Sequence, residues 1–193
     1  MDDFLSSLSQ ALQQVTNDLP YTLSLIGLLV FIHIVNALLG YRLNMLGIWP
    51  RKKWGWIGIP FSPFLHGNFR HLFFNACPLF IFANFVLLSG EKKFFAVTGI
   101  IILLGGFLVW IFGRRGVHIG ASTLIMGYLG FITMGIYHDP TPLSLLIGAV
   151  CLLYFGGLFL NLLPSKDKRV SWEGHVLGFI AGIIASYWLS FAY

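Results

Sequence analysis

Three short polar segments in an otherwise apolar chain contain the side chains that could do chemistry. The first holds His71 and Asn75, the second Ser122, and the third His175. His71 and Asn75 are four residues apart, so on a helix they lie on one face, one turn apart. A serine beside a neutral imidazole is the smallest set of groups for nucleophilic catalysis, with the histidine as general base. The pattern favours acyl-transfer chemistry.

Hydrogen-bond donors for an oxyanion, which such a site also needs, occur in the same segments. The available groups are the Asn75 side-chain NH2, a ring N–H of His71 and the backbone N–H of Ser122. Gly120 and Ala121 precede the serine and are small enough to allow close approach of the backbone. Nucleophile, base and donors are therefore all present.

A stripe of small residues follows His175 at helical spacing and comprises Gly178, Gly182 and Ser186. Such a stripe allows a second helix to approach closely. If the span that begins near Ser122 packs against this stripe, the serine meets the imidazole of His175.

The positions of the acidic residues exclude other mechanisms. The seven Asp and Glu residues lie at 2, 3, 18, 91, 139, 167 and 173, outside the centres of the apolar stretches. A carboxylate within a membrane is costly and usually functional. Acidic proton relays, intramembrane aspartyl proteases and His-Glu-x-x-His metalloproteases all need one. With no acid to orient the histidine, Ser122 and His175 would act as a dyad and not a triad.

Membrane helices are the elements that must position these groups. The 193 residues are 57% hydrophobic and 10% charged, against roughly 25% charged in soluble domains, and the mean hydropathy is +0.82. Six apolar stretches near the length of a membrane span predict an all-α polytopic membrane protein: 20–40, 72–89, 94–112, 119–137, 143–163 and 174–192. Residues 1–18 are predicted as a short surface segment, and 19–193 as the six-helix membrane domain.

The distribution of basic residues points to a lipid bilayer as the partner and not to nucleic acid. The net charge is +5, but the basic residues lie between apolar spans and form no patch of groove size. Ten of the 12 lie in the loops after spans 1, 3 and 5, so the positive-inside rule places both termini outside. Segment 41–71, the longest of these loops, combines Trp with Pro and Gly, which predicts a folded loop at the membrane interface.

Each polar residue also has a structural interpretation. A serine in a membrane helix often bonds the carbonyl one turn back, Asn75 could join two helices, and His71 could anchor at the interface. His118, in the loop before Ser122, could line the mouth of the catalytic site, but loop histidines are commonly just solvated. The catalytic interpretation is favoured because all three polar segments fall at span ends on the same side of the membrane.

The residues together resemble the rhomboid family of intramembrane serine proteases. The matching motifs are Gly120-Ala121-Ser122, His175 with the two glycines that follow, and His66 with His71 and Asn75. Segments 63–67 and 171–175 are similar to bacterial members, and the resemblance covers roughly 45–185.

The resemblance implies a six-helix rhomboid bundle with a water-filled cavity, in a bacterial plasma or inner membrane. Ser122 would be the nucleophile, His175 the base, and Asn75, His71 and Gly120 the oxyanion and substrate-binding residues. His66 would make a structural hydrogen bond. Substrates would be transmembrane segments of other proteins, with span 5 as a gate and the loop 164–172 as a cap. No metal or cofactor is implied, and both termini would be cytoplasmic, against the charge count.

Two residues depart from the family pattern. Thr123 occupies a position where members often carry glycine, which predicts a methyl and a hydroxyl close to the substrate carbonyl. Met126, one turn below Ser122, replaces an aromatic residue and is expected to pack against the imidazole of His175.

Two other classes of function compete with a serine endopeptidase. A catalytically impaired rhomboid-like scaffold would bind membrane helices without cutting them, although such a protein usually lacks the serine or the histidine. A transporter or channel would carry polar residues at the middle of several helices, whereas here they lie at one end.

Overall fold

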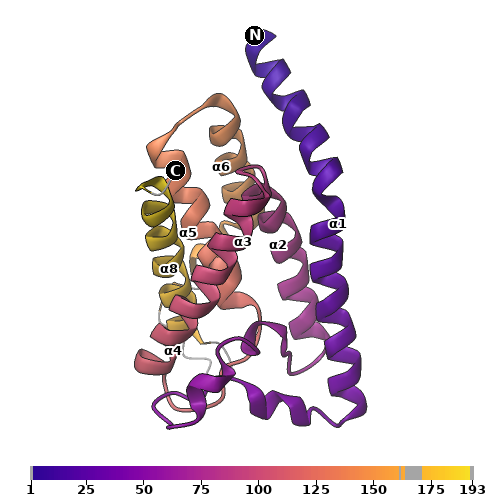
Figure 1. Cartoon of the computed structure of the whole chain (residues 1–193), viewed down its shortest axis with the longest axis vertical. Helices are drawn as coiled ribbons and strands as arrows, with labels where there is room; N and C mark the ends of the chain where they lie inside the picture. The colour runs from indigo at the N-terminus through magenta and orange to yellow at the C-terminus, as the bar shows by residue number, and fades with distance from the viewer. Residues whose placement is uncertain (1, 161, 164–170, 192–193) are drawn as a thin grey trace.

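The structure is a computed structural model that describes residues 2–160, 162–163 and 171–191, and these residues are helical apart from loops and one isolated bridge. Three short turns, η1 (Arg42–Leu46), η2 (Gly55–Gly58) and η3 (Ser62–Phe64), lie in the loop after the first helix. The other elements are α1 (Asp2–Leu38), α2 (Phe69–Leu87), α3 (Glu91–Ile100), the π-helical turn η4 (Ile101–Gly105), α4 (Gly106–Phe112), α5 (Ser122–His138), α6 (Pro142–Phe155), α7 (Gly157–Leu160) and α8 (Trp172–Phe191). In Figure 1 the N-terminal part of α1 extends beyond the other helices.

Each of the six predicted spans coincides with helix in the structure. Among the described residues, α1, α2 and the continuous helix 91–112 are long and apolar enough to cross a membrane, and α6 is apolar but shorter. Helix α1 runs without a break through residue 18, and the division into a surface segment (1–18) and a membrane domain (19–193) stays a prediction. The predicted cap, 164–172, lies outside the described residues except for its last two.

Helices α5 and α8 form the most extensive helix pair of the described chain. A Cβ atom at Gly178 would collide with the backbone carbonyl of Thr123, and one at Gly182 would collide with the carbonyl of Gly127. On the opposing helix, a Cβ at Gly130 would collide with the carbonyl of Phe179. The two backbones therefore touch through glycine on both sides, which confirms the packing predicted from the small-residue stripe.

The third membrane helix packs across this pair through its π-helical turn. The side chain of Ile101 occupies the space that a side chain at Gly127 would need. Gly105, at the other end of η4, is close enough to α8 that a Cβ there would lie 3.5 Å from the Cβ of Ala181. These contacts need small residues. Glycine at these positions therefore allows α5, α8 and the helix 91–112 to meet at one point.

The loop after α1 is folded onto the ends of the helices, as its composition predicts. Ile48 and His118 exchange two backbone hydrogen bonds of 3.0 and 2.9 Å. The guanidinium of Arg51 donates to the carbonyls of Ile111 and Gly113 at 2.8 and 2.7 Å. These carbonyls end α4 and would otherwise lack partners. The loop therefore holds both the end of α4 and the segment that leads to Ser122.

Replacement of Gly178 or Gly182 by alanine should separate α5 from α8, because even one methyl group would overlap a backbone carbonyl. A displacement of about 1 Å between Ser122 and His175 can lower the rate of a reaction that needs both side chains around 100-fold, so we expect a large loss of any such activity. The matched control is Gly135→Ala on α5, where an added Cβ meets nothing within 4 Å. Equal activity in all three variants would contradict the packing argument.

Candidate active site

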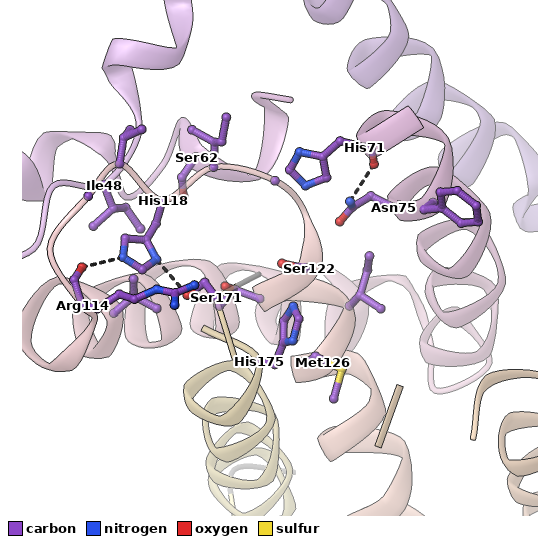
Figure 2. A pocket seen from close by; sticks show the side chains of 18 of the residues that line it. Ile48, Ser62, His71, Asn75, Arg114, His118, Ser122, Met126, Ser171 and His175 are labelled. Atoms are coloured by element: carbon purple, nitrogen blue, oxygen red, sulfur yellow. Dashed lines mark hydrogen bonds between the residues drawn. The ribbon is translucent and has the colours of Figure 1, made fainter. Parts of the chain in front are cut away.

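The predicted site residues all line a single cavity of about 880 Å³. They come from α2, from the loop 113–121 with the start of α5, and from the first turn of α8 (Figure 2). The predicted residues at the cavity are His71, Asn75, Gly120, Ser122 and His175. The structure therefore brings together residues that are more than 100 positions apart in the sequence.

Ser122 is the first residue of α5. At the N-terminus of a helix the first backbone N–H groups have no partner within the helix. The chain reaches this position through Gly120, whose φ of +108° is strained for any residue with a Cβ. The Gly120 N–H donates to the carbonyl of Ser62 at 2.9 Å. The left-handed turn therefore presents the serine at the cavity and ties it to the preceding loop.

His71 lies in the first turn of α2, with its ring against the backbone just before the serine. Its backbone N–H donates to the side chain of Asn68, the N-cap of the helix, at 2.8 Å. The Gly67 N–H donates to Nδ1 of His71 over a long 3.4 Å, which assigns the ring proton to Nε2. A Cβ at Gly120 would lie 2.6 Å from this Nε2. The imidazole thus places an N–H donor beside the turn that carries Ser122.

Asn75 is buried one turn further along α2 and faces the same cavity. Its Nδ2 donates to the backbone carbonyl of His71 at 2.8 Å (Figure 2). This bond uses one of the two N–H groups and fixes the plane of the amide. The second N–H is the one that could serve an oxyanion.

His175 lies in the first turn of α8 and is buried, with 7% of its surface exposed. Its neighbours Gly174 and Gly178 both pack against Thr123, so the imidazole is held at the level where α5 begins. Figure 2 shows His175 and Ser122 both at the cavity, with Met126 nearby. Met126 is fully buried and lines the cavity one turn below the serine. Its support of the imidazole stays a prediction.

In place of the expected structural hydrogen bond, His66 makes only a weak one with the backbone of Phe64. Its ring is fully buried and lies edge-on to the ring of His71, with centroids 5.0 Å apart. Within the described chain neither ring nitrogen has a hydrogen-bond partner of normal geometry. Burial, with a smaller contribution from His71, lowers the pKa of His66 to about 3, and the hydrogen bond with the Phe64 backbone opposes this shift. His66 is therefore a neutral ring that supports His71 by packing.

Thr123 lines the cavity, as expected, but its side chain also packs between helices. A Cβ at Gly105 would lie 3.2 Å from the Thr123 methyl carbon, and a Cβ at Gly174 would lie 3.2 Å from its hydroxyl oxygen. Both side-chain branches are therefore directed at the third and sixth membrane helices. Glycine at both positions makes room for the threonine.

His118 lines the cavity, but its hydrogen bonds there were not predicted from the sequence. Its Nε2 is 2.9 Å from the carbonyl oxygen of Arg114, and its Nδ1 is 3.0 Å from Oγ of Ser171 (Figure 2). The ring is thus held at both nitrogens and is not a solvated loop side chain. The available signal was spacing, since His118 precedes Ser122 by four residues, as Ser171 precedes His175.

Comparisons with known proteins agree with this geometry. A rhomboid domain is matched over residues 52–191. An uncharacterized protein of Mycobacterium tuberculosis is 37% identical over 176 residues, which cover 87% of this chain and 73% of the relative. An uncharacterized protein of Mycobacterium leprae is 33% identical over 176 residues, with 87% and 70% covered. A rhomboid-like protein of Arabidopsis thaliana is 30% identical over 128 residues, 62% of this chain and 32% of the relative. The chain belongs to the rhomboid family, a family of intramembrane serine proteases.

Replacement of Thr123 by glycine should lower the thermal stability in detergent and the rate of any reaction that uses Ser122 and His175. The change leaves a gap where α5, η4 and α8 meet, and glycine inside a helix costs up to about 1 kcal/mol. Thr133→Gly is the matched control, because Thr133 is exposed on the same helix. A faster Thr123→Gly enzyme would show instead that the threonine obstructs the substrate.

Proposed function

We propose that this protein is an intramembrane serine endopeptidase that cleaves transmembrane segments of other membrane proteins through a dyad of Ser122 and His175. The observation that carries the proposal is the single cavity lined by the serine, the histidine and the donors on α2. Membership of the rhomboid family supports the same chemistry.

The proposed reaction follows the general course of acyl transfer. Ser122 Oγ attacks the scissile carbonyl carbon while His175 accepts the hydroxyl proton, and the histidinium then donates that proton to the leaving amine. Water enters the cavity and hydrolyses the acyl-enzyme, with His175 again as the base. The oxyanion is stabilised by the N–H groups of His71, Asn75 and the Ser122 backbone. No step uses a metal or a cofactor.

We propose further that all six long helices cross the membrane, with both termini in the bacterial cytoplasm. Helices α5 and α8 pack against the third membrane helix, 91–112. If α5 and α8 cross the membrane beside it, the backbone contacts among the three helices lie within the hydrocarbon layer. The cavity and the loop 41–65 then lie together near the outer surface. Helix α6 would be the gate through which a substrate helix enters.

Replacement of Ser122 or His175 by alanine should abolish cleavage of a reporter transmembrane substrate in liposomes, with the folded protein intact by thermal unfolding. Ser122→Ala should also lose labelling by a fluorophosphonate, which needs the activated hydroxyl. Ser89→Ala and His138→Ala are matched controls, because both residues are exposed and neither lines the cavity. Residual cleavage by either dyad variant at the control rate would contradict the dyad.

The scaffold alternative makes a different prediction for the wild-type protein in the same assay. A scaffold would bind transmembrane peptides without cleaving them and would not react with the fluorophosphonate. That result would overturn the proposed function.

Asn75→Ala should lower turnover with little change in substrate binding, because it removes one donor to the oxyanion. Loss of one such donor typically costs about 10²–10³-fold in rate. The matched control is Asn84→Ala on the same helix, since Asn84 also donates one turn back, to the carbonyl of Phe80 at 2.8 Å, but does not line the cavity. Equal turnover in the two variants would make Asn75 a helix-stabilising residue.

A further inference from the structure

We propose that His118 and Ser171 are positioning residues, and that the hydrogen bond between them fixes the position of His175, the base, relative to Ser122, the nucleophile. The proposal rests on the proposed function. One partner lies four residues before Ser122 and the other four residues before His175, so one bond joins the two segments that carry the dyad.

Ser171 sets the position of the first turn of α8. Its Oγ accepts a hydrogen bond from the Gly174 N–H at 3.2 Å, as an N-cap does. Its carbonyl oxygen accepts from the His175 N–H at 3.3 Å. A displacement of Ser171 is therefore transmitted directly to the backbone of the proposed base.

His118 is fixed just as firmly on the other side. Its backbone N–H and carbonyl both pair with Ile48, and its Nε2 lies 2.9 Å from the carbonyl oxygen of Arg114. Two residues later, Gly120 bonds to Ser62. The ring thus projects from a segment anchored to the loop 41–65, and not from a flexible connection.

The hydrogen-bond partners assign the protons of this contact. A carbonyl oxygen can only accept, so Nε2 of His118 carries the ring proton and Nδ1 is an acceptor. The hydroxyl of Ser171 therefore donates to Nδ1 while its oxygen accepts from the Gly174 N–H. Every group is satisfied by this one arrangement, so removal of either side chain leaves a partly buried group without its partner.

The charges around the imidazole are consistent with its neutral form. Burial lowers the pKa of His118, and the cations Arg114 and Arg51 act in the same direction. The carboxylate of Glu173 and the bond to the Arg114 carbonyl oppose them. A neutral ring keeps Nδ1 available as the acceptor for Ser171.

An ion pair joins the same two segments. Nε of Arg114 lies 3.7 Å from Oε2 of Glu173, and both side chains are partly exposed. Such pairs are weak and tolerate changes in geometry. The shorter, directional bond between His118 and Ser171 is the contact that can define a register.

Glycine packing alone does not define the register at the cavity. The contacts of Gly178 and Gly182 set how close α8 comes to α5, but both glycines lie beyond His175 along the helix. The bond between His118 and Ser171 adds a directional contact at the cavity end, where a misplacement of about 1 Å would cost around 100-fold in rate.

The test is a double-mutant cycle with Ser171→Ala, His118→Ala and the double variant, in liposomes with a fluorogenic transmembrane substrate. We expect each single variant to lower kcat about 10- to 100-fold with KM nearly unchanged, and the double variant to be no worse than the worse single one. Ser171→Thr, which keeps the hydroxyl, should restore kcat and the rate of fluorophosphonate labelling.

Thr141→Ala is the control for the loss of an ordinary cap, because Thr141 accepts from the Ser144 N–H at 3.1 Å at the start of α6. It should lower thermal stability, and because α6 is the proposed gate, any effect on activity should appear in KM; Ser89→Ala, which removes the hydrogen bond from the Ser89 hydroxyl to the Val86 carbonyl at 2.6 Å away from the cavity, is the control for an unchanged kcat. Ser171→Ala removes one oxygen atom, so it tests the bond even if His118→Ala fails to fold.

Two results would overturn the proposal while leaving the proposed function intact. One is wild-type kcat in Ser171→Ala, and the other is a double variant whose loss equals the product of the single losses. Absence of both cleavage and labelling in the wild-type protein would instead overturn the proposed function, and the positioning role with it.

Discussion

The contact on which the rest of the structure depends is the direct backbone contact between α5 and α8. It needs glycine at Gly178 and Gly182, because a single methyl group would overlap the opposing carbonyls. In a bilayer, helices gain little from burying apolar side chains against each other, so close packing must supply the association. This contact brings the helix that begins with Ser122 against the helix that carries His175, and so it makes the cavity a candidate catalytic site.

The sequence was sufficient for those features that depend on local pattern. Apolar length predicted the helices, and the spacing of His71 with Asn75 and of His175 with its glycines predicted which faces meet. Both patterns are periodic, so each can be recognised without knowledge of the partner helix. The five predicted site residues line one cavity, although their chemical roles remain proposals.

The features that sequence could not provide depend on contacts between distant segments. Thr123 was expected to face the substrate, and it does line the cavity, but its side chain also packs against Gly105 and Gly174, which belong to other helices. His118 resembled a solvated loop residue because its partner, Ser171, lies 53 positions away. His66 was expected to form a structural hydrogen bond, but it makes only a weak one and packs against a neighbouring ring. In each case the side chain's role is set by what tertiary packing places beside it.

The same reasoning bears on the orientation of the chain in the membrane. The positive-inside rule counts every basic residue in a loop as if it made no contact within the protein. The Arg51 guanidinium, however, caps the end of α4. The ammonium of Lys52 lies 4.1 Å from the ring centroid of Trp49, and Arg114 is paired with Glu173. These charges stabilise a folded loop that closes one end of the bundle. Because they are part of the fold, they are weaker evidence about topology than their number indicates.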